Sequence, residues 1–204
     1  LKVISYIGKE VMLDARLLVQ VRDDDLAIEV DNGQTNFKLR PANKPRVLVT
    51  GAAGTIGAAA SIALAKSGWS LALHARDLQA VQEIELACLA HGADVTIHSA
   101  DLKQERAVRN LAIEASKLGP ITAVVHLASP AVDASLNQLM AVNYTALINL
   151  SNFLVPEMLK AQSGQILFIG SSALQYHPEG WDNYVAAKGA ASEWTLDLSK
   201  KFSS

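Results

Sequence analysis

The sequence predicts an α/β fold in which a doubly wound parallel sheet follows a small N-terminal antiparallel β extension. Three observations predict it. From residue 46 onward, short strands that are apolar throughout alternate with helical stretches, which is typical of a parallel sheet covered on both faces. The first of these strands leads through a glycine-rich turn into a helix. Before residue 41, apolar residues mostly alternate with polar ones, which is typical of antiparallel strands.

Residues 1–40 are expected to form an antiparallel β meander, and residues 41–45, with two prolines, a stiff linker. The alternating runs are Leu17–Val21, Leu26–Val30 and Phe37–Leu39. Turn signals separate them at Asp23-Asp24-Asp25 and Asn32-Gly33. Two interpretations stay open: the meander is the tail of a preceding domain, or it is a local extension that packs on the core.

Residues 46–204 are expected to form one further domain of five strand–helix units. The expected strands, each with the helix that follows it, are Arg46–Thr50 and Thr55–Ser67, Ser70–His74 and Leu78–Ala90, Asp94–His98 and Gln104–Leu118, Ile121–Leu127 and about Leu136–Lys160, and Gln165–Gly170 and about Trp181–Lys201. The apolar segment Ile166–Ile169 should be central and buried, yet in this sequence it would form an edge of the sheet. Because a long apolar edge is an aggregation hazard, we expect that the domain is C-terminally truncated, or that another polypeptide supplies the missing strands.

Composition and charge limit the classes of partner. The chain has 204 residues, of which 50% are hydrophobic, enough for one sizeable core. Its formal net charge of −2, without a cluster of lysines and arginines, argues against a nucleic acid or a membrane surface as the partner. No apolar run approaches the roughly 20 residues that cross a bilayer. The single cysteine, Cys88, cannot form an internal disulfide, so we expect a cytoplasmic protein.

The strand that ends at Thr50 runs into a turn typical of phosphate binding. Glycine is needed in such a turn because the backbone adopts positive φ and a pyrophosphate approaches the main chain. Gly51, Gly54 and Gly57 supply it, and the last of them lets the helix pack closely on the sheet. The helix N-terminus then presents free N–H groups to the anion. The turn therefore predicts a dinucleotide site, although its spacing differs from Gly-x-Gly-x-x-Gly.

The end of the second strand of this domain indicates which dinucleotide is bound. A carboxylate there would accept hydrogen bonds from the ribose hydroxyls and repel a 2′-phosphate. The expected acidic position holds Ala75 and is followed by Arg76, whereas Asp77 comes one position late and is expected to cap the next helix. Because a guanidinium facing a phosphate contributes roughly 1.5–3 kcal/mol, we expect NADP(H), with NAD(H) as the weaker candidate.

Over about residues 45–204, the chain resembles the short-chain dehydrogenase/reductase family, whose fold is Rossmann-like. The residues that match its cofactor turn are Thr50, Gly51, Gly54, Ile56 and Gly57, with Thr55 at a position that is usually small. Asp101, followed by Leu102, matches the family's adenine-binding aspartate. Ala128 is the one match in His126-Leu127-Ala128-Ser129, where the family usually has Asn-Asn-Ala-Gly.

The catalytic tetrad of the family is matched in order by Asn143, Ser171, Tyr184 and Lys188. Tyr184 is the expected acid, which protonates a carbonyl oxygen while hydride reaches the carbon. Its unperturbed pKa near 10 is too high for easy exchange, and Lys188, one helical turn further on, is expected to lower it. The resemblance implies that Lys188 and Tyr184 also bind the cofactor, with Lys188 on the nicotinamide ribose. Ser171 would bond the substrate oxygen, and Asn143 would anchor a water in the proton relay.

The resemblance implies an NADP(H)-dependent oxidoreductase that interconverts a ketone and a secondary alcohol and that is a homo-oligomer as an intact protein. The meander resembles the last strands of a hot-dog-fold acyl-thioester hydratase, which favours a 3-oxoacyl thioester as the substrate. Two alternatives stay open. An extended-type nucleotide-sugar epimerase or dehydratase shares the Gly-x-x-Gly-x-x-Gly spacing and the His-Leu-Ala run, and a non-catalytic cofactor-binding or oligomerisation module needs no chemistry. We expect no metal site, because the five histidines lack metal-ligand spacing.

Overall fold

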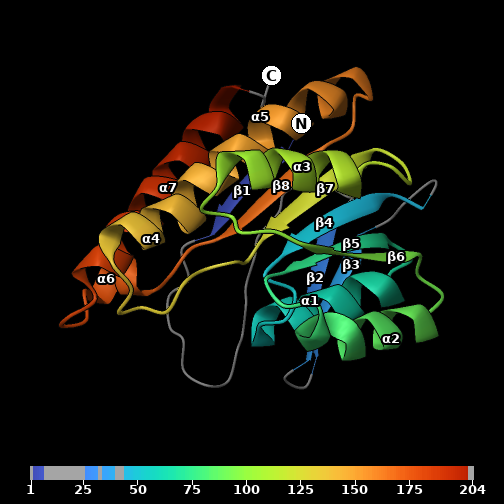
Figure 1. The fold of residues 1–204 in the computed structure, drawn as a ribbon, viewed down its shortest axis with the longest axis horizontal. Coiled ribbons are helices and arrows are strands. Elements are labelled where there is room, and N and C mark those ends of the chain that lie inside the picture. The colour runs from blue at the N-terminus through green and yellow to red at the C-terminus, as the bar shows by residue number, and fades with distance from the viewer. Residues whose placement is uncertain (1, 7–25, 32–33, 40–43, 202–204) are drawn as a thin grey trace.

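A computed structural model of the chain describes the backbone of residues 2–6, 26–31 and 34–39, and the backbone and side chains of residues 44–201. A parallel six-stranded sheet forms the centre, with the strand order β1-β8-β7-β4-β5-β6 (Figure 1). Its strands are β1 (Lys2–Tyr6), β4 (Arg46–Thr50), β5 (Ser70–Ala75), β6 (Val95–Ser99), β7 (Ile121–His126) and β8 (Gln165–Ile169). The doubly wound parallel sheet predicted from residue 46 onward is thereby confirmed.

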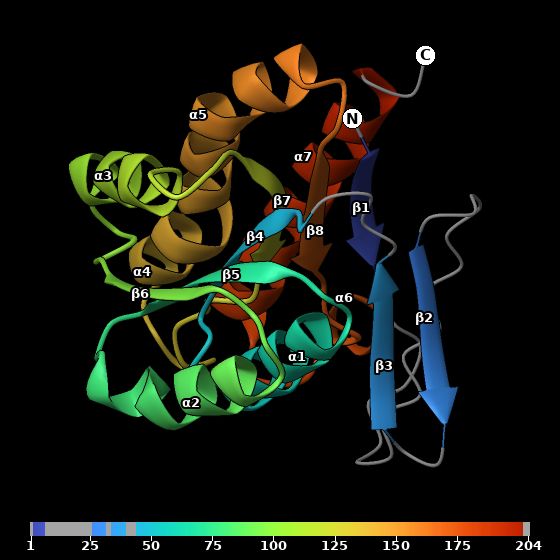
Figure 2. The same ribbon diagram turned by 90° about the vertical axis from the view of Figure 1, so that its right-hand side faces the viewer.

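Helices cover both faces of the sheet (Figure 2). They are α1 (Thr55–Lys66), α2 (Gln82–Ala90), α3 (Glu105–Ala115), α4 (Leu136–Met140), α5 (Ala146–Lys160), α6 (Ala173–Tyr176) and α7 (Asp182–Lys201). A 3₁₀ turn, η1 (Gln79–Val81), precedes α2, and a π-helical turn, η2 (Ala141–Thr145), joins α4 to α5. One apolar cluster lies between the sheet and α1 with α2, and the other between the sheet and α3, α5 and α7.

Strand β4 shows why its three central residues, Val47, Leu48 and Val49, are apolar. Its side chains alternate between the two clusters, with Val47 and Val49 on the α1 side and Leu48 on the α3 side. All three are 0% exposed. Burying such a side chain stabilises the fold by roughly 1.5–3 kcal/mol, so a strand covered on both faces is apolar throughout. The central strand thus holds its carboxyl end, where the glycine turn starts, in a fixed position.

The N-terminal region confirms part of the predicted meander. Strands β2 (Leu26–Asp31) and β3 (Gln34–Leu39) form an antiparallel pair in which Ile28 faces Phe37. The pair lies beside α1 (Figure 2). The third expected strand, Leu17–Val21, lies outside the described residues.

The expectation that Ile166–Ile169 forms an edge of the sheet is wrong. Strand β1 pairs with β8 in parallel, with Ile4 opposite Leu167, so that β8 is an inner strand. The segment Lys2–Tyr6 mixes apolar with polar residues and carries a weak strand signal, and its partner lies more than 160 residues away in the sequence. Such a pairing depends on the assembled sheet and on contact with α7, which local sequence patterns do not report.

The expected helix Leu136–Lys160 is also divided. The π-helical turn η2 interrupts it, with the N–H of Ala146 bonded to the carbonyl of Ala141. A π turn inserts one residue without breaking the run of apolar positions, so the pattern predicts one continuous helix. The expected helix Leu78–Ala90 begins instead as the turn η1. Asp77 accepts a hydrogen bond from the N–H of Gln79 at 2.9 Å, but the expectation that Asp77 is the N-cap is wrong by one residue, because the N-cap of η1 is Leu78.

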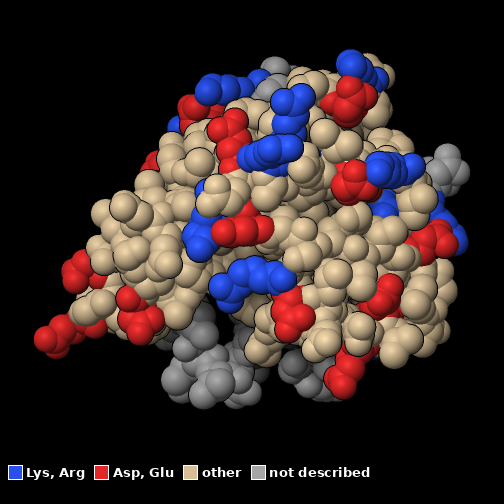
Figure 3. All heavy atoms as spheres, viewed as in Figure 1, with Lys and Arg blue, Asp and Glu red and all other residues tan. Residues whose placement is uncertain are grey.

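Charged side chains of both signs are interspersed over the face shown in Figure 3, without a large patch of one sign. In the part of the chain that the structure describes, no helix is long and apolar enough to cross a membrane.

Candidate active site

The glycine turn between β4 and α1 is built by close backbone contacts. Gly51 has φ +71°, and a Cβ there would lie 2.7 Å from the backbone nitrogen of Ala128. A Cβ on Gly57 would lie 2.1 Å from the carbonyl oxygen of Gly51. Gly54 is the N-cap of α1 and offers no side chain to cap it. The first N–H groups of α1 are therefore available to an anion, as the sequence predicts.

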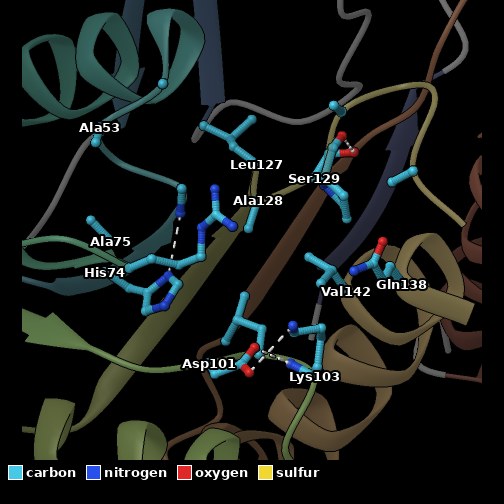
Figure 4. A pocket seen from close by; sticks show the side chains of 17 residues that line it. Ala53, His74, Ala75, Asp101, Lys103, Leu127, Ala128, Ser129, Gln138 and Val142 are labelled. Carbon is cyan, nitrogen blue, oxygen red and sulfur yellow. Dashed lines mark hydrogen bonds and ion pairs between the residues drawn. The ribbon is translucent and has the colours of Figure 1, made fainter. Parts of the chain in front are cut away.

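A cavity of ≈ 560 Å³ opens in front of this turn (Figure 4). Its volume is in the range of small-molecule sites. Six of the predicted cofactor residues line it: Gly51, Gly54, Arg76, Asp101, Leu102 and Ala128. Sequence reasoning missed other lining residues, among them His74, Lys103, Ser129, Gln138 and Val142. Most of these lie within three residues of a predicted one, and Gln138 alone is isolated in sequence from any motif.

The four remaining predicted residues of the turn do not line the cavity. Thr50 is fully buried behind it, and its Oγ1 accepts a hydrogen bond from the backbone N–H of Ala128 at 3.3 Å. Gly57 is buried against Gly51. Thr55 and Ile56 open α1 and are exposed. Thr50 and Gly57 therefore support the turn from behind.

The carboxyl ends of β5 and β6 form one wall of the cavity. Arg76 is exposed and lines it, as does Asp101, whose carboxylate lies 3.6 Å from the Lys103 ammonium. His74 is buried, and its Nε2 lies 3.0 Å from the carbonyl oxygen of Ala100. Burial lowers the pKa of His74, so its imidazole is neutral near pH 7 and its Nδ1 accepts from the N–H of Gly51 at 3.4 Å.

The structure brings Ser171 and Tyr184 together. Ser171 follows β8, and Tyr184 lies in the first turns of α7. The Ser171 hydroxyl lies close enough to the phenol to lower its pKa, but burial has the larger effect and raises that pKa overall. The indole of Trp181 packs edge-on against the Tyr184 ring, with 5.6 Å between the ring centroids, and remains 36% exposed. Trp181 therefore both packs and faces the outside beside the phenol.

Lys188 is the buried cation of the site, with 5% exposure. Its Nζ donates to the carbonyl oxygen of Ile169 at 3.0 Å and lies 4.7 Å from the Phe168 ring centroid. Burial lowers the pKa of Lys188 to about 8. The expectation that Lys188 lowers the pKa of Tyr184 is wrong for this geometry, because the ammonium is directed at Ile169 and burial dominates at the phenol.

Asn143 lies in the π-helical turn η2 and is fully buried. Its Nδ2 donates to the carbonyl oxygen of Leu139 at 3.1 Å, whereas its Oδ1 has no hydrogen-bond partner among the described residues. A buried amide oxygen without a partner is costly, by roughly 1–3 kcal/mol. This orphaned acceptor marks a place where a water or another donor would be held.

The sheet order and the glycine turn define a Rossmann-like α/β domain. Residues 45–204 match the family described as short chain dehydrogenase. The chain belongs to the short-chain dehydrogenase/reductase family.

Among curated relatives, the acetoacetyl-CoA reductase of Allochromatium vinosum is 30% identical over 168 residues, which cover 76% of this chain and 67% of that protein. The 3-ketodihydrosphingosine reductase of Mus musculus is 30% identical over 158 residues, covering 71% of this chain and 48% of that protein. The chain thus spans between about half and two thirds of these relatives.

Solved structures show the same fold. A metagenomic short-chain oxidoreductase in complex with NADP superposes with a TM-score of 0.73 at 25% identity, covering 78% of this chain and 77% of that one. A 3-oxoacyl (acyl-carrier-protein) reductase from Agrobacterium tumefaciens with NADP bound gives 0.74 at 24% identity, covering 81% and 66%. An NAD⁺-bound xylitol dehydrogenase gives 0.72 at 23% identity, covering 79% and 66%.

Proposed function

We propose that the chain forms the cofactor site and proton-transfer group of an NADP(H)-dependent oxidoreductase that interconverts a ketone and a secondary alcohol. One observation carries the proposal: the Ser171 hydroxyl lies beside the half-buried Tyr184 phenol at the carboxyl end of the sheet, and the buried Lys188 Nζ lies 5.8 Å from the centre of the Tyr184 ring. A phenol that burial keeps protonated and that lies beside a hydroxyl is suited to donate a proton to a carbonyl oxygen.

The cavity fits a dinucleotide. The glycine turn, whose Gly51 and Gly54 line the cavity without side chains, and the uncapped start of α1 suit a pyrophosphate. When bound, the nicotinamide would supply or accept hydride. The part of this chain is to hold the proton at Tyr184 Oη, to orient the substrate oxygen with Ser171, and to place positive charge nearby with Lys188. The orphaned Oδ1 of Asn143 suits a water that would resupply the proton.

NADP(H) is the cofactor that the cavity wall favours. Arg76 and Lys103 line the cavity at the ends of β5 and β6, and both side chains are exposed. Two cationic groups on this wall suit a 2′-phosphate, and position 75 holds an alanine in place of a carboxylate that would repel one. Solved relatives carry either NADP or NAD, so this preference is argued from this chain's own residues.

A 3-oxoacyl thioester is the substrate class we propose. The names of an acetoacetyl-CoA reductase, a 3-ketodihydrosphingosine reductase and a 3-oxoacyl (acyl-carrier-protein) reductase share a 3-oxo group, and two of them share the acyl thioester. We place the reaction in the cytoplasm and expect a homo-oligomer for the intact protein.

Replacing Tyr184 by Phe tests this function. With NADPH and acetoacetyl-CoA as probes, we expect Tyr184→Phe to lower turnover by about 10²–10⁴-fold, because the proton donor is lost, while the NADPH dissociation constant changes less than about twofold. Tyr176→Phe is the matched control, since Tyr176 is 61% exposed on α6 and should leave both quantities unchanged. Failure of the unaltered chain to bind NADPH, or turnover that survives Tyr184→Phe, would overturn the proposal.

A further inference from the structure

A single imidazole bridges the two halves of the site. His126 is the last residue of β7 and is fully buried. Its Nδ1 lies 2.9 Å from Oγ1 of Thr50, which directly precedes the glycine turn. Its Nε2 lies 2.9 Å from the carbonyl oxygen of Val142, which directly precedes Asn143 in η2. The His126 side chain thus contacts Thr50, which supports the cofactor turn, and also η2, the helical turn that carries the unpartnered Oδ1 of Asn143.

The direction of every hydrogen bond in this bridge follows from its chemistry. The Val142 carbonyl can only accept, so Nε2 of His126 carries the proton and donates. Nδ1 is then an acceptor, and the hydroxyl of Thr50 must donate to it. The lone pairs of Thr50 Oγ1 accept from the backbone N–H groups of Leu127 and Ala128, at 3.2 and 3.3 Å. Burial lowers the pKa of His126 to about 3, which keeps this arrangement in one protonation state near neutral pH.

These bonds connect atoms that form the cavity wall. Ala128 and Val142 both line the cavity. The backbone of Ala128 occupies the space where a Cβ on Gly51 would lie, so the end of β7 and the glycine turn are in direct contact. Val142 lies in the π turn η2, which departs from regular helix geometry. The Nε2–H of His126 donates to the carbonyl of Val142 and so fixes the position of this turn relative to β7.

The ring of Phe168 lies between the His126 imidazole and Lys188 and contacts both. His126 stacks on Phe168, with 6.3 Å between the ring centroids and 25° between the planes. The Lys188 ammonium lies 4.7 Å from the centre of the Phe168 ring. The attraction between a cation and an aromatic face holds Lys188 there. A displaced His126 ring would therefore also shift the surface on which Lys188 rests.

We propose that His126, protonated on Nε2, is a positioning residue that holds the glycine turn and the Asn143 turn in register for the reaction. The proposal rests on the proposed function for its kinetic consequences, but its geometry can be tested without turnover. Its two contacts can also be separated, because the amide of asparagine reaches about as far as Nδ1 of histidine and the amide of glutamine about as far as Nε2.

The kinetic test compares His126→Asn with His126→Gln. His126→Asn keeps a partner for Thr50 and loses the contact with Val142, so kcat with NADPH and acetoacetyl-CoA should fall about five- to tenfold while the NADPH dissociation constant stays within about twofold. His126→Gln keeps a donor to Val142 and loses the contact with Thr50, so NADPH binding should weaken about five- to tenfold with a smaller change in kcat. If both variants unfold more easily but leave kcat and NADPH affinity unchanged, His126 is structural only and the proposal is wrong.

A spectroscopic test does not depend on activity. In the chain labelled with ¹⁵N-histidine, the His126 resonances should report a proton on Nε2, a bare Nδ1 and no titration between pH 5 and 8. A proton on Nδ1, or a titration in that range, would overturn the bridge whatever the enzyme does. If instead the spectrum is as expected and the unaltered chain does not reduce acetoacetyl-CoA, the bridge stands and the proposed function has failed.

Discussion

Replacing Gly57 by alanine would perturb the cofactor turn at its tightest point. The added Cβ would lie 2.1 Å from the carbonyl oxygen of Gly51 and 2.8 Å from Cα of Ala52. Both neighbours are backbone atoms, so no side chain can rotate away. Ordinary contact begins at 3.4 Å, and the start of α1 would have to recede from Gly51 by about 1.3 Å.

The cost can be estimated from that displacement. Overpacking a well-packed site typically costs about 1–3 kcal/mol, and here the atoms that must move are those that would face the pyrophosphate. We expect Gly57→Ala to lower the free energy of unfolding by about that amount. We also expect it to weaken NADPH binding by about tenfold or more, since the helix N-terminus leaves its place. Urea unfolding and a fluorescence titration with NADPH measure the two effects.

Gly68→Ala is the matched control. Gly68 has φ +84° and nothing within 4 Å of an added Cβ, so only the left-handed backbone would be strained. That strain costs about 1–2 kcal/mol of stability and should leave NADPH affinity unchanged. If Gly57→Ala bound NADPH as tightly as the unaltered chain, the contact between α1 and the turn would not hold the site, and the reasoning would be refuted.

Two further changes test the charges of the site. Because burial lowers the pKa of Lys188 from 10.5 to about 8, the unfolded chain binds more protons between these values, and the unfolding free energy should rise across that window by up to about 3 kcal/mol and then level off. Lys188→Met should lack this rise in urea unfolding at pH 7.5 and 10, and an unchanged pH dependence would contradict the burial argument. Arg76→Ala should weaken NADPH binding about tenfold and leave NADH binding within about twofold, as measured by paired titrations. An equal loss of affinity for NADPH and NADH would show that Arg76 does not bind the 2′-phosphate.

Much of the fold from residue 46 onward was predictable because its signals are local. Strand β4 is apolar at Val47, Leu48 and Val49 because both of its faces are buried, and that requirement can be read within five residues. The glycine turn was predictable for the same reason, since Gly57 packs closely against the carbonyl of Gly51, only six positions earlier in the sequence. The predicted cofactor residues that line the cavity lie at the ends of such strands.

The parts that could not be predicted depend on distant partners. The pairing of β1 with β8 joins segments more than 160 residues apart, and Lys2–Tyr6 has no strong pattern of its own. The π turn lies inside a continuous apolar and helical stretch, and no residue type marks where the hydrogen-bond pattern changes, so the sequence did not predict it. The hydrogen bond of the Lys188 ammonium was also not predicted. Its acceptor is the backbone carbonyl of Ile169 on β8, and every residue type carries such a carbonyl.

By itself, the sequence determined the strands and helices of the reductase domain, the glycine turn, and the order of Ser171, Tyr184 and Lys188, because periodicity and spacing encode them within a few turns of chain. Only the tertiary structure decided that His126 joins Thr50, 76 residues away, to Val142, 16 residues away. It also decided which way each of those hydrogen bonds points. A buried imidazole takes its protonation state and tautomer from the partners that surround it, and these exist only once the sheet has assembled.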